Sequence, residues 1–274
     1  MEKAESSSEK RQKRLDAALR KAITQSDAAS VEESLKNGAN PRAFADDENA
    51  FNALMQAAFD NDERSLRIML GKGGAKDANA KGETALMIAA WRGSEECLRQ
   101  LLPISDANTQ DEDGWNALMW ATRRTRTGCM AELLPKTRLN AHDANGWTAL
   151  MVAAQGHPES LELLLPGSDP EQRNSNDDTA LMVALKLLKS GAIEDESALE
   201  CARLLFPLSD LKAVNKDGES ALSLGKTLEG ESSQKLAQEM LALHEQRELQ
   251  REIEAAEENS ARSIAAVDKK AIRL

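Results

Sequence analysis

The sequence contains no tyrosine, and its only aromatic residues are four tryptophans and four phenylalanines among 274 residues. Hydrophobic residues still make up 41% of the chain, and alanine and leucine are abundant among them. This composition argues against one large aromatic core and favours many short helices packed through small side chains. A chain of this length exceeds the usual single-core domain, so we expect an extended array rather than one globule.

Cysteines and long apolar runs are also scarce. Cys97, Cys129 and Cys201 are too few and too widely spaced for a disulfide framework, which favours a reducing compartment, and we expect the cytoplasm. The charged opening MEKAESSSEKRQKR is not a signal peptide, and no run approaches 18 apolar residues, so we expect no membrane span. Export as a host-directed effector by a dedicated secretion machine stays compatible with this sequence.

Charge and missing motifs exclude further classes of function. The net charge of -11 argues against general nucleic-acid binding, which needs a dense cationic face. The three histidines lie far apart, and the sequence has no glycine-rich phosphate loop, nucleophile motif or metal signature. We therefore expect a protein that is not an enzyme and that holds no metal and no cofactor.

A short block repeats along the chain. NALMQAA, TALMIAA, NALMWAT, TALMVAA, TALMVAL and SALSLGK start at positions 52, 84, 116, 148, 179 and 220, at intervals of 32, 32, 32, 31 and 41 residues. Each block opens with Asn, Thr or Ser, which cap helix N-termini. A second apolar run such as ECLRQLL follows, and Pro or Gly then ends it. The unit is therefore helix, turn, helix and long polar loop.

These units resemble the ankyrin repeat family. ISDANTQDEDGWNAL from Ile104 and LSDLKAVNKDGESAL from Leu208 are similar to the family's loop and helix opening, and NGANP closes an earlier helix pair. The resemblance implies an all-α solenoid of stacked helix-turn-helix units with short hairpin loops, followed by a C-terminal helical tail. We expect a charged N-terminal tail at 1–14, the array at 15–243 with about six repeats after a capping unit, and a charged helix or tail at 244–274.

The repeats depart from the family pattern at several positions. Thr-Pro-Leu-His is here Thr-Ala-Leu-Met, a form that looks bacterial, and we expect the methionine to pack in the histidine's place. One unit has Arg124 and Thr125 where others have a turn glycine, and another carries about ten extra residues around KLLKSGAIEDE. In the shared register Ser65, Cys97, Cys129, Ser160 and Cys201 are equivalent, which predicts small residues that face the partner helix.

The same register places most aromatic residues on one surface. The resemblance to ankyrin repeats implies that the residue after the loop glycine and the last residues of the first helix line the concave binding side. Those positions hold Phe51, Phe59, Trp91, Arg92, Trp115, Arg123, Arg124 and Trp147. Trp120 borders this group. Clustered rings and arginines are typical of binding hot spots, although the rings could instead stiffen the array by packing against neighbouring loops.

We therefore expect a protein–protein interaction scaffold that binds another protein through this face and is monomeric without its partner. Replacing Trp115 or Trp147 should weaken binding and leave folding nearly unchanged. Two alternatives stay open. The chain could be an inhibitor or immunity-type protein that occludes an enzyme or toxin, or an assembly protein that self-associates through its C-terminal helix.

Overall fold

A computed structural model describes residues 6–45, 50–190 and 196–271, with side chains up to residue 258. The described residues form helices joined by turns, and isolated antiparallel bridges such as Ala78 with Thr84 occur at the loops. The predicted all-α array of helix pairs is confirmed. Parts of three predicted segments lie outside the described residues, namely 1–5 of the tail, 191–195 of the insertion and 272–274 of the C-terminal segment.

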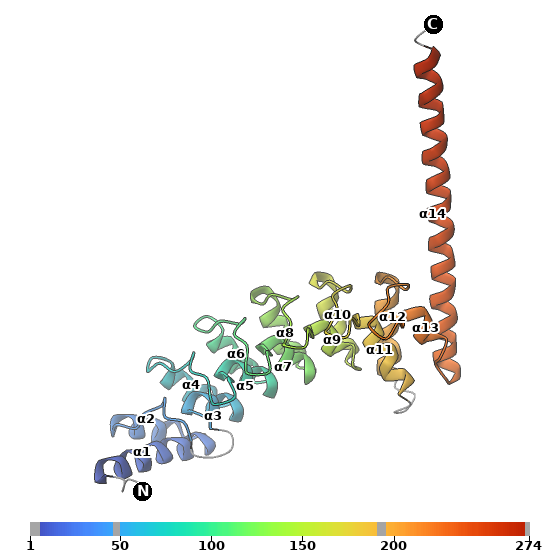
Figure 1. The fold of residues 1–274 in the computed structure, drawn as a ribbon. Helices are drawn as coiled ribbons and strands as arrows, with labels where there is room; N and C mark the ends of the chain where they lie inside the picture. Colours follow the sequence, from blue (N-terminus) through green and yellow to red (C-terminus); the bar gives the residue numbers. More distant parts are fainter. Residues whose placement is uncertain (1–5, 46–49, 191–195, 272–274) are drawn as a thin grey trace.

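The helices form two rows along the array (Figure 1). The first helices of the units are α1 (Ser7–Thr24), α3 (Ala53–Asp60), α5 (Ala85–Arg92), α7 (Ala117–Arg123), α9 (Ala149–Ala153), α11 (Ala180–Lys189) and α13 (Ala221–Gly225). The second helices are α2 (Ala28–Lys36), α4 (Glu63–Leu70), α6 (Glu95–Leu101), α8 (Thr127–Leu133), α10 (Pro158–Leu164), α12 (Glu196–Leu205) and α14 (Glu231–Ala271). Short 3₁₀ turns follow three of them: η1 (Leu134–Lys136), η2 (Leu165–Gly167) and η3 (Phe206–Leu208).

Side-chain caps begin the first helices where the sequence predicts them. The side chains of Asn52, Thr84 and Asn116 accept a hydrogen bond from the backbone N–H three residues later. The side chains at positions 148, 179 and 220 do the same. These bonds satisfy amide groups that the helix itself leaves unpaired, so the repeated block sets where each first helix starts.

Small and flexible apolar side chains fill the core between the rows. Met55, Met87 and Met119 are at most 2% exposed, as predicted for the family's histidine position. The equivalent residues Ser65, Cys97, Cys129, Ser160 and Cys201 are all 0% exposed. The thiols of Cys97 and Cys129 contact carbonyl oxygens in the first helix of the preceding unit, α3 and α5 respectively, so these small residues have the structural role that was predicted. Burial raises the pKa of each of these two thiols to about 12, so neither is a nucleophile at neutral pH.

Tight turns, here called fingers, connect one unit to the next. The side chains of Asn79, Asp111, Asp143, Asn174 and Asn215 each accept backbone N–H bonds from residues two and four positions on. The sequence predicts this self-bonded turn. Gly114 has a φ of +84°, and a Cβ there would lie 2.9 Å from the backbone nitrogen of Ala144 in the next finger. Glycine therefore lets adjacent fingers stack closely.

The two ends of the array differ from the predicted boundaries. Helix α1 starts at Ser7 and not at residue 15, because Ser6 and Glu9 form a capping box. Helix α14 starts in the last unit and continues without interruption past residue 244, so a single helix joins the array to the charged C-terminal segment. It extends well away from the other helices (Figure 1). No described helix has the length and apolar character needed to cross a membrane.

Candidate functional site

The fingers and the first helices together form one surface, here called the finger face. The turn of each finger places its last residue, the one before the helix cap, beside the first helix of the same unit. Two hollows open on this surface, and both are lined by finger residues and first-helix residues. All eight predicted site residues lie on the finger face or at its edge, where the first helices end.

The first hollow has a volume of about 340 Å³ and is largely apolar. Its lining residues come from three consecutive units: Phe51, Phe59, Lys81, Glu83, Met87, Ile88, Trp91 and Trp120. The Phe59 ring stacks on the Trp91 ring with centroids 5.9 Å apart and planes 22° apart. Phe51, which the register predicts as a partner-facing ring, is only 6% exposed, because it packs against Phe59 at 5.6 Å in the second unit of the array. Phe51 is therefore part of the floor of this hollow.

Two arginines cover the stacked rings. The Cζ atom of Arg92 lies 4.4 Å from the Phe59 centroid, and its Nε donates to the carbonyl oxygen of Phe59 at 3.0 Å. The Cζ atom of Arg124 lies 5.2 Å from the Trp91 centroid. Cation–π attraction holds both guanidinium groups in place over the rings. The predicted residues Phe59, Trp91, Arg92 and Arg124 thus form one continuous stack across three units.

The second hollow, of about 370 Å³, lies one unit further on and is lined by Asp113, Trp115, Trp120, Arg123, Asp143, Asn145, Trp147, Val152 and Gln155. Trp120 lines both hollows, so they are neighbours. Its indole N–H donates to the Asp111 carboxylate at 2.7 Å, and its ring packs against Trp115 at 4.9 Å. Sequence analysis placed Trp120 only at the border of the site, whereas the structure places it at the centre.

The position of Trp120 within its repeat could have identified it as a residue that lines the hollows. It is the fourth residue after its helix cap, and the equivalent residues of the neighbouring units are Ile88 and Val152. These three side chains line the hollows. The position four residues after the cap therefore faces the fingers, together with the two positions that the family resemblance implied.

Trp115 and Trp147 are equivalent in the register but differ in their bonding. The Trp115 indole N–H donates to Oδ2 of Asp143 at 3.2 Å, while Oδ1 of the same carboxylate accepts the finger's backbone N–H groups. In the next finger Asn174 replaces the aspartate, and its single oxygen already accepts two backbone N–H groups. The amide has no second acceptor. Among the described residues, the Trp147 indole N–H consequently has no hydrogen-bond acceptor.

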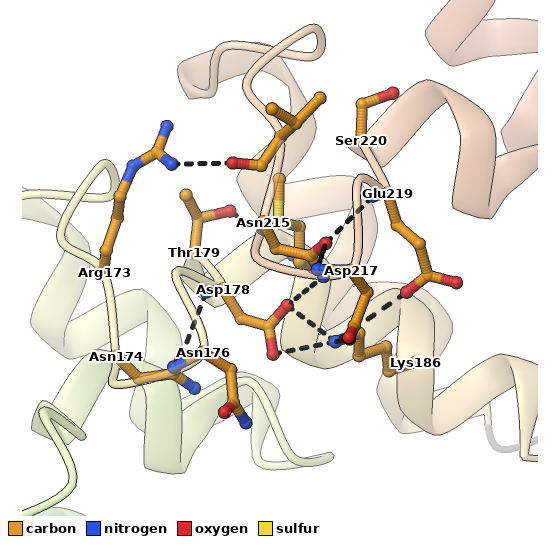
Figure 2. A network of polar contacts seen from close by, with 12 residues as sticks. Arg173, Asn174, Asn176, Asp178, Thr179, Lys186, Asn215, Asp217, Glu219 and Ser220 are labelled. Atoms are coloured by element: carbon orange, nitrogen blue, oxygen red, sulfur yellow. Dashed lines mark hydrogen bonds and ion pairs between the residues drawn. The ribbon is translucent and has the colours of Figure 1, made fainter.

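Beyond Trp147 the finger face changes from aromatic to ionic. Asp178, at the position equivalent to Trp147, is 4% exposed, and Lys186 of α11 reaches its carboxylate at 2.7 Å (Figure 2). Asn215 of the next finger donates to the same carboxylate at 2.7 Å. Lys186 also lies 3.8 Å from Glu219, which Lys189 binds at 3.0 Å. Sequence analysis did not predict this network, because only the charged residues themselves are visible in the sequence.

The pKa shifts of Lys186 and Glu219 follow from the ion pairs that the two residues form. Burial alone disfavours the ammonium form, but the hydrogen bond to Asp178 and the charges of Asp178 and Glu219 raise the pKa of Lys186 above its ordinary value. The hydrogen bond from Lys189 lowers the pKa of Glu219. Each charged group here therefore has a partner of opposite sign, and no cluster of His, Cys, Asp or Glu among the described residues is arranged to hold a metal ion.

Comparisons with known proteins agree with this architecture. A family model of three consecutive ankyrin repeats matches residues 19–111 and again residues 94–174, which together span more than half of the chain. The chain belongs to the ankyrin repeat family. Ankyrin-type helix pairs continue beyond the matched residues, through α11 with α12 and α13 with the start of α14. No curated protein sequence matches the chain.

Solved ankyrin domains share the fold at low sequence identity. The ankyrin repeat domain of human ASB11 matches with a TM-score of 0.66 and 22% identity, over 82% of this chain and 96% of that one. The ankyrin repeat domain of Bcl-3, a member of the IkappaB protein family, matches with a TM-score of 0.66 and 19% identity, over 81% of this chain and 97% of that one. At these identities the similarity establishes the fold alone. Ankyrin repeats in general are non-catalytic modules for protein–protein interaction.

Proposed function

We propose that this ankyrin protein is a non-enzymatic scaffold that binds another protein through the aromatic half of its finger face, the part between Phe59 and Trp147. The two adjoining hollows carry this proposal. They are lined by rings and arginines, the residue types that dominate binding hot spots, and they are open to solvent. These rings are half-buried, and their remaining surface is contiguous and lines the two hollows, which favours a binding site over a purely structural role.

The surface is preformed, which favours affinity. Stacked fingers bond to one another through backbone groups, as in the bond from the N–H of Glu112 to the carbonyl of Lys81 at 3.0 Å. Ring stacking and cation–π contacts already restrict the side chains of Trp91 and Arg92. Binding therefore costs little additional side-chain entropy. The indole N–H of Trp147 offers a hydrogen bond that a partner can accept without breaking one inside the array.

The experiment uses the variant Trp147→Ala. The full chain, this variant and the control Leu208→Ala are immobilised, exposed to native lysate, and the retained proteins are identified. Leu208 is an exposed apolar residue on η3, away from both hollows. The retained partner is then purified and titrated against all three proteins.

We expect Trp147→Ala to weaken binding by about 2 kcal/mol, as for a central hot-spot ring, and Leu208→Ala to have no effect. Equal affinity for all three proteins would contradict the proposal. Affinity for a basic partner that falls steeply as salt is raised, without dependence on Trp147, would instead favour the inhibitor alternative, since charge steering is screened by salt.

The long helix α14 favours a second candidate function, self-assembly. Leu249 and Ile253 lie one turn apart on this helix and are 59% and 45% exposed. Two such helices could cover these residues by pairing. Light scattering over a range of concentrations tests this candidate, with Leu249→Glu/Ile253→Glu as the variant expected to stay monomeric. A wild-type chain that is monomeric at every concentration would remove it.

A further inference from the structure

Three arginines at the edge of the aromatic half form no ion pair within the part of the chain that the structure describes. Arg92, Arg123 and Arg124 are exposed, and no carboxylate of the described residues lies within ion-pair distance of them. Two other arginines of the array do have such partners: Arg42 contacts Asp77 at 2.8 Å, and Arg99 contacts Glu132 at 3.1 Å. The chain as a whole has 46 acidic residues and a net charge of -11.

The three side chains are nevertheless held in place. Arg92 lies over Phe59, and Arg124 lies over Trp91. Arg123 donates to the side-chain oxygen of Gln155 at 3.1 Å. Because neutral groups hold them, the guanidinium groups keep their charge uncompensated and most of their N–H donors unused. A group that binds them therefore meets donors that are already positioned.

Positive and negative side chains lie at opposite edges of the hollows. The arginines lie where first helices α5 and α7 end, whereas Asp113 lies on the finger side of the second hollow. Apolar side chains, including Ile88 and Trp120, lie between these two edges. A basic ligand at the helix ends would face three unpaired guanidinium groups, while a carboxylate there forms charge-assisted, bidentate hydrogen bonds.

Building on the proposed function, we propose that the partner contributes an acidic peptide segment. Its carboxylates bind Arg92, Arg123 and Arg124 at the helix ends, and an adjacent bulky apolar side chain enters the hollow between Phe59 and Trp120. The occupant is thus a segment of another protein in which Asp or Glu lies next to a large apolar residue.

Peptide selection tests this proposal. Random 12-residue peptides displayed on phage are selected on the immobilised full chain, and enriched sequences are made with a fluorescent label for polarisation titrations. The variant Arg123→Gln/Arg124→Gln is compared with the matched control Arg64→Gln/Arg67→Gln, which removes the same charge from exposed positions on α4. Circular dichroism and thermal melting confirm that both variants fold.

We expect enriched peptides to combine Asp or Glu with a bulky apolar residue. Arg123→Gln/Arg124→Gln should weaken them at least tenfold, and the control should leave them unchanged. Replacing the peptide carboxylates by amides should lower the affinity for wild type by a similar factor. It should change the affinity for the arginine variant little, because the two changes remove the same contact.

The other outcomes separate this inference from the proposed function. Enriched peptides that are basic or uncharged, yet lose affinity in Trp147→Ala, would overturn the acidic segment and keep the finger face as the binding site. Peptides indifferent to both Trp147→Ala and the arginine variant would overturn both. A selection that yields no peptide dependent on these arginines also overturns the acidic segment.

Discussion

The residue just before the first-helix cap is a tryptophan in the units of α7 and α9 and a carboxylate in the units of α11 and α13. Trp115 and Trp147 line an open hollow. Asp178 and Glu219 occupy the equivalent position, but lysines of α11 bind both carboxylates. The same repeat position therefore serves two kinds of surface. In the ionic half, the part of the finger face with Asp178, Lys186, Lys189 and Glu219, the charged groups pair with one another. In the aromatic half, rings and guanidinium groups stay available to a partner.

Helix length produces part of this difference. In the aromatic half, α7 ends at Arg123, and Thr125 turns the chain with a φ of +52°. In the ionic half, α11 continues to Lys189, so its last turns carry Lys186 and Lys189 toward the finger carboxylates. Self-paired charges contribute to stability and offer little to a partner. We infer that the binding surface stops at the ionic half, whose ion pairs stabilise the contact between the last units.

The largest expected effect comes from breaking the ionic half with Lys186→Met. The buried Asp178 would keep its bond from Asn215 but lose its cation, and an unpaired buried charge is costly. Because the lysine side chain is 31% exposed, we expect a loss of about 2 to 3 kcal/mol in unfolding free energy, below the range for a fully buried pair. Urea denaturation followed by circular dichroism measures it.

Lys189→Met is the matched control for that experiment. Lys189 is 42% exposed and, among the described residues, pairs only with Glu219, itself 30% exposed, so its loss should cost at most about 0.5 kcal/mol. Partner binding should be the same in both variants. Equal destabilisation by the two substitutions would mean that burial of Asp178 does not distinguish the pairs.

A second prediction divides the aromatic half itself. Trp115→Ala removes the ring contact with Trp120 and the bond to Asp143 that links two fingers, so we expect a stability loss of about 2 kcal/mol. Among the described residues Trp147 makes neither kind of contact, although its half-buried ring packs against the core, so Trp147→Ala should cost less stability than Trp115→Ala does. Thermal and urea unfolding of both variants test this. A more severe loss for Trp147→Ala would show that its ring is structural.

This distinction revises the expectation that both tryptophans could be replaced without affecting folding. Sequence register placed Trp115 and Trp147 on one surface because position in a repeat is periodic. The bond that separates them depends on the residue one repeat later, which is Asp143 in one case and Asn174 in the other. A comparison of neighbouring fingers, rather than of each repeat with a consensus, would have found the difference.

Other features follow the same division between local and non-local causes. Helix caps such as Asn52 and finger turns such as that at Asp143 depend on residues within four positions, so the sequence predicts them well. The burial of Phe51 was missed because it depends on Phe59, whose ring packs against it in the second unit. The early start of α1 was predictable, since Ser6 and Glu9 have capping-box spacing.

A third, smaller effect concerns the turn that ends α7. Thr125 is β-branched and has a left-handed backbone, a conformation that costs about 1 to 2 kcal/mol for a residue with a Cβ. Gly93 and Gly156 occupy the equivalent position in neighbouring units. Thr125→Gly should therefore raise the unfolding free energy by about 1 kcal/mol, after the bond to His157 and the greater freedom of glycine in the unfolded chain are subtracted.

Asn61→Gly is the control for this turn, because Asn61 has a φ of +57° and asparagine tolerates that conformation. It should change stability less than Thr125→Gly does. Peptide or partner affinity should be unaltered in both variants, since Arg123 and Arg124 precede the turn. A Thr125→Gly variant that is more stable but binds more weakly would show that the strained turn helps to present the arginines.

The smallest effect is the pH response of the ionic half. The hydrogen bond from Lys189 lowers the pKa of Glu219 in the folded state, so its contribution to stability is complete above the ordinary pKa of 4.5 and is lost as pH falls through the lowered value. Glu219→Gln should therefore have a lower urea midpoint than wild type at pH 7, and this difference should shrink as the solution is acidified. Glu245→Gln, the same change at an exposed position on α14, should show no such convergence. If the Glu219 difference were independent of pH, the contact with Lys189 would act through shape and not through charge, and the ionic half would not be held together electrostatically at that position.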